Sequence, residues 1–231
     1  MKSKLLALAL FSFTISFISC EQTDANLLTE DPENGVINEV MNIPAMTTDS
    51  SDLTASETEG LLKMREEEKL AHDVYDSFYN TYKLIVFDRI SNSELRHTQA
   101  VLSLINYYEI TDPAMAEAGK FSNVGVQDLY DKLIASGTSD TEALKTGAYI
   151  EEYDIADLKK LIEEFQNQDV VNVYAHLLRG SEFHLRAFAW NLKIRGIVYE
   201  QQILSQEDFD TILSGKSIAP AIDVTGQCIM F

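Results

Sequence analysis

Four segments of the chain repeat apolar side chains in alternating steps of three and four residues, and polar side chains break each repeat near its middle. This spacing places the repeating side chains on one face of an α-helix. An all-α fold is therefore predicted, in which four long helices turn these faces toward a common core. The repeats are Leu61, Met64, Glu68, Ala71, Tyr75, Phe78, Tyr82; Phe87, Ile90, Glu94, His97, Val101, Leu104, Tyr108; Leu144, Gly147, Glu151, Asp154, Leu158, Leu161, Phe165; and Val170, Tyr174, Leu177, Ser181, His184, Phe188.

The four polar breaks are predicted to lie at one level of the core. Antiparallel helices joined by a short loop bring together residues that are equally distant from that loop. The midpoint for the first two breaks falls near Tyr82, and that for the last two falls near residues 166–168, both beside polar residues suited to a turn. Roughly 30 residues separate the second and third helices, whereas an ordinary bundle loop has about 2 to 8. We expect a four-helix bundle with a long crossover there, a short helix around 127–134 in that crossover, and another around 206–213.

Carboxylates and imidazoles in an apolar core need a partner. Glu94 and His97 share one helix face and could bind one metal ion or two adjacent ones. Four ionised carboxylates would repel one another there unless cations compensated them. Two divalent cations would balance them, although the shorter side chain of Asp154 also leaves a single ion open. In the metal-free alternative, the run of residues 66–68 is a solvated face and His184 bonds to Ser181. The candidate ligands are Glu68, Glu94, His97, Glu151, Asp154 and His184.

Several peptide strings resemble a known superfamily. Residues 68–75, 94–97 and 151–154 have the sequences EKLAHDVY, ELRH and EEYD, which resemble the first three metal-binding elements of ferritin-like di-iron carboxylate proteins, especially rubrerythrins. The strings MREEEKLAHDVY, GAYIEEYDIADL and LLRGSEFHLRAF resemble a ferritin-like branch known as domain of unknown function 2202. The resemblance spans about residues 59–215 and implies a ferritin-like bundle.

The superfamily pattern implies one lone Glu from each of two helices and a Glu-x-x-His pair from each of the other two. Applied to this sequence, the pattern implies that Glu68 and Glu151 are the lone glutamates. Glu94 and His97 are then the first pair, and His184 belongs to the second. Ser181 departs from the pattern because it stands where the second pair's Glu is expected. Glu182 is turned about 100° away from that face, and Asp154 is the expected compensation, so the site should be better furnished around His97 than around His184.

Other polar and aromatic residues border these positions. Tyr75 and Tyr174 are expected as hydrogen-bond partners beside the ligands, or as plain core residues. His72, one turn from Glu68, is a candidate auxiliary ligand, and His176 lies off the apolar face and is expected to be structural.

Oxygen and imidazole ligands favour iron or manganese, and the resemblance makes iron the first choice. The resulting hypothesis is a di-iron oxidoreductase that acts as a ferroxidase or reduces peroxide or dioxygen. The chain has no C-x-x-C pair, so its reductant would be an external electron donor. The alternative is a metal-free helical bundle that serves as a structural or interaction module at the cell surface.

The N-terminus predicts export. Lys2 and Lys4 precede an apolar run over residues 5–18, which is typical of a signal peptide. Residues 17–20, Phe-Ile-Ser-Cys, resemble a relaxed bacterial lipobox, which implies a lipoprotein of the cell envelope anchored through lipidated Cys20. A plain secretory signal and an uncleaved anchor are the alternatives. The expected divisions are a signal peptide (1–19), a flexible acidic tether (20–57), the bundle (58–215) and a C-terminal tail (216–231).

The net charge of −19 argues against nucleic acid and anionic lipid as partners. Contact with a membrane is therefore expected only through the lipid anchor. Cys228 has no assigned role.

Overall fold

The computed structural model describes residues 52–221, which form six α-helices and no strand. Four helices are long: α1 (Ala55–Tyr82), α2 (Ile85–Tyr107), α4 (Asp140–Glu164) and α5 (Gln168–Lys193). Two are shorter: α3 (Val124–Ser136) and α6 (Gln206–Leu213). The all-α prediction is confirmed. The expected signal peptide, Cys20, Cys228 and most of the tether and tail lie outside the described residues.

Side-chain caps define the first residue of every helix except α2. Thr54 accepts a hydrogen bond from the backbone N–H of Glu57, whose carboxylate accepts one from the backbone of Thr54, so α1 begins at a capping box. Four other helices also begin at a residue whose side chain accepts a backbone hydrogen bond. These residues are Asn123 for α3, Ser139 for α4, Asn167 for α5 and Ser205 for α6. The bounds of α6 coincide with the expected helix, and α3 is longer than expected because its cap lies at Asn123.

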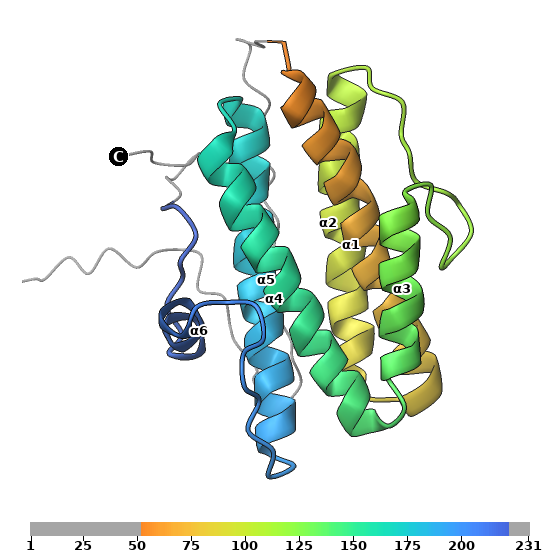
Figure 1. The fold of residues 1–231 in the computed structure, drawn as a ribbon, viewed down its shortest axis with the longest axis vertical. Helices are drawn as coiled ribbons and strands as arrows, with labels where there is room; N and C mark the ends of the chain where they lie inside the picture. Colours follow the sequence, from red (N-terminus) through yellow and green to blue (C-terminus); the bar gives the residue numbers. More distant parts are fainter. Residues whose placement is uncertain (1–51, 222–231) are drawn as a thin grey trace, which may run out of the picture.

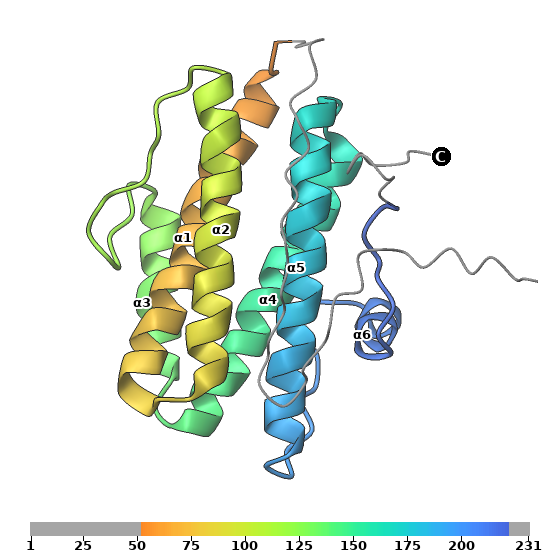
Figure 2. The same ribbon diagram turned by 180° about the vertical axis from the view of Figure 1, so that it is seen from behind.

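The long helices form two antiparallel pairs, α1 with α2 and α4 with α5 (Figures 1 and 2). The turns fall where the polar breaks predicted them, at residues 83–84 and 165–167. Helix α2 packs beside α5 and α1 beside α4, which closes the two pairs around one core. The long connection from α2 to α4 returns along the outside and includes α3, which packs against α1 and α4 (Figure 1).

The core between the pairs is apolar and aromatic except at the level of the polar breaks. The rings of Phe87 and Phe188 lie 5.6 Å apart, and Tyr75 packs 5.2 Å from Phe188. Within residues 52–221, no helix has both the length and the apolar character that crossing a membrane requires.

Candidate metal centre

Four helices each contribute a buried polar side chain to the middle of the core. Glu68 comes from α1, Glu94 and His97 from α2, Glu151 from α4 and His184 from α5, and none is more than 2% exposed. Each lies on the face of its helix that carries the apolar repeat. Because these faces pack against one another in the core, the polar side chains are buried with them. The sequence-predicted residues therefore share one chamber, apart from Asp154.

One cluster forms around His97. Its Nδ1 atom lies 2.8 Å from Glu94 Oε2 and 3.2 Å from Glu68 Oε2. A second cluster forms around His184, whose Nδ1 atom lies 2.7 Å from Glu94 Oε1 and 3.4 Å from Glu151 Oε2. Glu94 belongs to both clusters, with one carboxylate oxygen directed to each imidazole.

These separations suit hydrogen bonds between imidazole and carboxylate, and they also suit ligand atoms around an ion. Atoms bound at right angles, about 2.1 Å from one metal, lie about 3 Å from each other. In each cluster, one ligand atom from each of the three residues lies within 4.8 Å of the others. The two imidazoles are stacked at an angle of 26° between their planes, with ring centroids 5.4 Å apart. The clusters could therefore hold one ion each, bridged by Glu94.

Burial and mutual repulsion disfavour the ionised carboxylates. Burial raises the pKa of Glu68 to about 8, against the opposing attraction of His97. Burial and the charge of Glu94 raise the pKa of Glu151 to about 7. Glu94 differs because its two imidazole neighbours outweigh the effect of burial and hold its pKa below the usual range. Without an ion, protons therefore supply part of the positive charge that the chamber requires.

The pKa of His184 is also set by burial and by the neighbouring charges, which act in opposite directions. Burial lowers its pKa, but the carboxylates of Glu94 and Glu151 overcome that effect and raise the pKa to about 10. A positive charge is thus favoured at this position. A metal ion bound to neutral imidazole would supply that charge in place of the proton.

Tyr75 fixes Glu151 from the side away from His184. Its hydroxyl donates to Glu151 Oε1 and is 3.3 Å from the carbonyl oxygen of Gly147. A side chain at Gly147 would place Cβ 2.6 Å from the Phe188 ring, so glycine permits α4 to approach α5 there. The hydroxyl therefore orients Glu151 and leaves Oε2 directed toward His184.

Asp154 does not join either cluster. It accepts a hydrogen bond from Ser181, which also lies 3.2 Å from the carbonyl oxygen of Leu177. Burial and the charge of Glu68 raise the pKa of Asp154 well above its usual value. Each cluster instead has one imidazole, one glutamate of its own and the shared Glu94, so the expected imbalance between the two sides is absent.

Three other residues weighed from the sequence lie outside the clusters. His72 Nδ1 lies 2.9 Å from both the hydroxyl and the carbonyl oxygen of Ser91, at the contact of α1 with α2. Glu182 accepts hydrogen bonds from the backbone N–H groups of Ile218 and Ala219. Tyr174 is fully buried, and its hydroxyl has no hydrogen-bond partner within the described part of the chain.

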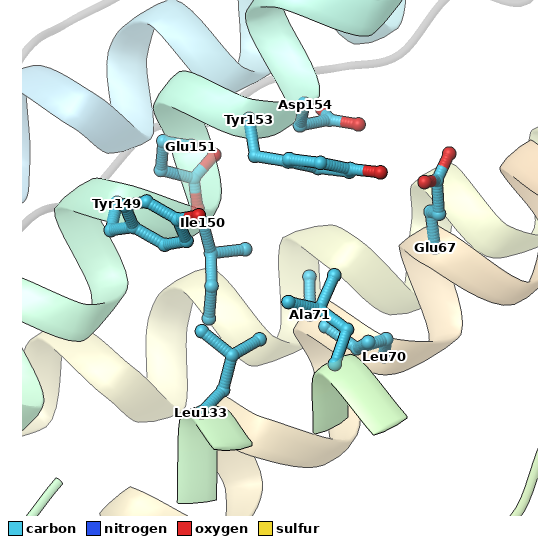
Figure 3. A pocket seen from close by; sticks show the side chains of 10 residues that line it. Glu67, Leu70, Ala71, Leu133, Tyr149, Ile150, Glu151, Tyr153 and Asp154 are labelled. Carbon is cyan, nitrogen blue, oxygen red and sulfur yellow. The ribbon is translucent and has the colours of Figure 1, made fainter. Parts of the chain in front are cut away.

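Sequence reasoning missed Glu67, which belongs to a run of three glutamates that suggested a solvated face. Glu66, Glu67 and Glu68 are all buried. Glu67 lines a pocket between α1, α3 and α4 that also reaches Glu151 and Asp154 (Figure 3). Burial raises its pKa to about 7 despite the nearby ammonium of Lys63. The position of α3, which covers this side of α1, could not be read from the run itself.

The chemistry of the chamber fits a metal ion. Glu68 Oε1 and His184 Nε2 are buried without a hydrogen-bond partner within residues 52–221, while the imidazole Nδ1 atoms face carboxylate oxygens. Two such clusters offer nitrogen and oxygen donors and no thiolate, which suits iron, manganese or zinc.

Comparison with known proteins covers the same helices. Residues 57–216 match the family described as Uncharacterized protein domain (DUF2202). The uncharacterized protein MJ0754 of Methanocaldococcus jannaschii is 44% identical over 167 residues, which are 71% of this chain and 90% of that protein. The crystal structure of hypothetical protein MJ0754 matches with a TM-score of 0.72 at 43% identity, covering 74% of this chain and 99% of that chain. Residues 57–216, the segment that matches the family, include every candidate ligand.

Proposed function

This chain belongs to the DUF2202 family of uncharacterized protein domains, and we propose that its domain is a ferritin-like four-helix bundle holding a pair of metal ions, with iron as the natural metal. The observation that carries the proposal is the position of Glu94, whose Oε2 and Oε1 atoms lie 2.8 and 2.7 Å from the imidazoles of His97 and His184. One carboxylate that meets two imidazoles suits a bridging ligand. Glu68 and Glu151 complete the two sides.

The antiparallel helix pairs and the long external crossover support the ferritin-like assignment. A metal-free structural module is disfavoured because its core would retain three glutamates facing two imidazoles at considerable cost. Hydrocarbon side chains would fill a purely structural core at lower cost. The convergence of the five side chains is therefore better explained by a bound ion than by packing.

The proposed activity is ferroxidase or peroxide or dioxygen reduction. A ferrous pair would supply two electrons to the oxidant. The protein's residues set the conditions: Tyr75 orients Glu151, and the aromatic side chains of Phe87 and Phe188 exclude water from that side of the chamber. Glu68 and Glu151 would exchange their protons for metal when the centre is loaded. An external electron donor would return the centre to its reduced state.

Metal analysis of the full chain tests this proposal. After anaerobic loading with Fe²⁺ and removal of loose metal, we expect about two ions per chain for the unmodified protein and almost none for Glu94→Ala/His97→Ala. A matched control, Glu59→Ala/His176→Ala, removes the same residue types outside the clusters and should keep its iron. Near-zero iron in all three proteins would contradict a metal centre. Oxidation of the bound Fe²⁺ by dioxygen or peroxide then tests the activity.

We place the protein at the bacterial cell envelope, anchored through lipidated Cys20. The proposal rests on the sequence of the first 20 residues. Cys20→Ser should move the protein from the membrane fraction to the soluble fraction of a cell lysate. Unchanged membrane retention would contradict the lipid anchor.

A further inference from the structure

A pocket between α1, α3 and α4 borders the proposed metal centre at Glu151 (Figure 3). Its walls come from α1, α3 and α4, and partly exposed Tyr153 and Asp154 lie along it. Glu151, a proposed ligand and only 1% exposed, also lines the pocket. The pocket therefore has a side chain of the proposed centre in its wall and two partly exposed residues of α4 beside it.

Most side chains that line the pocket are apolar or aromatic, and its charged side chains are all acidic. Glu67, Glu151 and Asp154 line it, and its lining, which lies wholly within residues 52–221, includes no lysine, arginine or histidine. In Figure 3, the carboxylate of Asp154 and the hydroxyl of Tyr153 point across the pocket toward Glu67. Carboxylates separated from bulk water attract a cation more strongly than they would in solvent.

A cationic group already lies beside Glu67. Lys63 Nζ is 2.8 Å from Glu67 Oε1 and 2.8 Å from Asp157 Oδ2. The side chain of Lys63 is 35% exposed, whereas that of Glu67 is 7% exposed. Lys63 can therefore retain Asp157 and solvent contact while another cation takes its place beside Glu67. The ammonium group marks a position where these carboxylates hold positive charge.

Within residues 52–221, buried oxygen atoms without a hydrogen-bond partner occur on both α1 and α5. Glu67 Oε2, the hydroxyl of Tyr174 and Glu68 Oε1 are all buried without a hydrogen-bond partner within the described residues. Tyr174 is fully buried, and the charges that act on its hydroxyl include Glu67, Glu68 and Asp154. Tyr174 does not line the pocket, but burial and the carboxylates of both the pocket and the centre raise the pKa of its hydroxyl. Oxygen donors of this kind can replace part of the water shell of a divalent cation.

We propose that a divalent cation reaches the metal centre through this pocket and is first held there by Glu67 and Asp154. The inference rests on the proposed function, because the centre is the destination. Glu67 and Asp154 bind the cation only on its way to the centre. The five residues of the two clusters hold the ions at equilibrium. Lys63 competes with the arriving cation for Glu67.

Stopped-flow uptake of Co²⁺ by the metal-free full chain tests the route, with absorbance as the rate signal and equilibrium dialysis as the measure of bound metal. Glu67→Gln keeps the shape of the side chain and removes its charge. We expect uptake about tenfold slower at unchanged equilibrium content. Glu59→Gln, an exposed change of equal charge on the same helix, should stay within about twofold of the unmodified chain. Lys63→Gln should accelerate uptake.

The outcomes separate the route from the centre. Slower uptake by Glu67→Gln together with faster uptake by Lys63→Gln supports the route. Unchanged rates with normal Co²⁺ content overturn the route alone, as does a loss of equilibrium binding in Glu67→Gln, which would make Glu67 a ligand. If the unmodified chain binds no Co²⁺, the proposed centre fails and the route fails with it. Should Glu67→Gln misfold, an unchanged rate in Lys63→Gln overturns the route by itself.

Discussion

Glu151 and Glu152 are neighbours on α4 and are both buried, yet they have opposite surroundings. Glu152 accepts a hydrogen bond from the hydroxyl of Tyr199 and others from the backbone N–H groups of Gln202, Ile203 and Leu204. Glu151 faces the imidazole of His184 and the carboxylate of Glu94, with only the hydroxyl of Tyr75 behind it. Glu152 therefore holds two segments of the chain together through hydrogen bonds, whereas Glu151 lies among ionisable side chains and is a candidate metal ligand.

The same division recurs along the helices. Glu66 accepts from the backbone of Ser122 and Asn123 and so secures the start of α3. Glu182 likewise secures the segment at Ile218. Backbone N–H groups therefore donate hydrogen bonds to the carboxylates of Glu66 and Glu182. The carboxylates of Glu68 and Glu94 instead lie beside imidazoles and beside each other. Burial alone therefore does not distinguish a candidate ligand from a structural carboxylate, whereas the type of partner does.

The largest expected effect is a difference in metal affinity between two variants, in which either Glu151 or Glu152 is replaced by glutamine. Glu151→Gln removes an anionic ligand from the His184 cluster, and we expect affinity for the second ion to fall by about 100-fold or more. Glu152→Gln should change affinity by less than about threefold. Metal titration followed by calorimetry measures both. Equal losses in the two variants would remove the distinction between them.

Removal of metal should make stability depend on pH in a specific direction. Burial raises the pKa values of Glu68 and Glu151 to about 8 and 7, so the folded chain retains protons that the unfolded chain loses from about pH 4.5 upward. His184, raised to about 10, acts in the same direction above its ordinary pKa of 6.5. The lowered pKa of Glu94 opposes them only in more acidic solution.

The unfolding free energy of the metal-free chain should therefore fall by roughly 2 kcal/mol or more between pH 5.5 and 8. Metal should reverse this trend, because its ligands bind in deprotonated form. Denaturant titrations at several pH values measure the slope. The slope should flatten in Glu68→Gln/Glu151→Gln and persist in Glu152→Gln, and a metal-free chain that gains stability over this range would contradict the assignment.

Glu152→Gln should mainly reduce folding stability. The uncharged amide weakens several hydrogen bonds to the segment that precedes α6, at a cost of about 2 kcal/mol. Urea denaturation of the metal-free protein at neutral pH provides the measurement. Glu151→Gln relieves repulsion under the same conditions and should leave stability unchanged or raise it, so a larger loss in Glu151→Gln would reverse the expected order.

The smallest effect is expected for Tyr75→Phe. Loss of the hydroxyl frees Glu151 Oε1 but leaves the aromatic packing against Phe188 in place. We expect affinity for the second ion to fall about tenfold, or about 1.4 kcal/mol, with little change at the first ion. Competition with a chelator of known affinity measures the two steps. An unchanged second step would show that Tyr75 does not orient Glu151.

Helical periodicity predicted more of the fold than of the site's surroundings. The apolar repeats and the polar turns defined the long helices, and residues 206–213 were predicted as the helix now seen as α6. The common level of Glu68, Glu94 and Glu151 followed from distances to the loops. The partners of Glu66, Glu152 and Glu182 could not be predicted, because their N–H donors come from irregular segments that have no periodicity.

The pairing of Asp154 with Ser181 illustrates a further limit. Both residues lie on apolar faces, so sequence spacing made Asp154 a candidate ligand and Ser181 a missing one. In the structure these two side chains bond to each other instead. The hydroxyl of Ser181 on α5 donates a hydrogen bond to the carboxylate of Asp154 on α4. That choice depends on how closely two helices approach, which the residue pattern alone does not specify.

Glu94 lies between the imidazoles of His97 and His184, and anomalous X-ray diffraction from iron-loaded crystals tests most directly whether it bridges two ions there. Data collected on either side of the iron absorption edge should show two peaks, one beside Glu68 and His97 and the other beside Glu151 and His184, with Glu94 between them. Iron located only at surface carboxylates, with the five side chains in contact without an ion, would contradict the proposed metal centre.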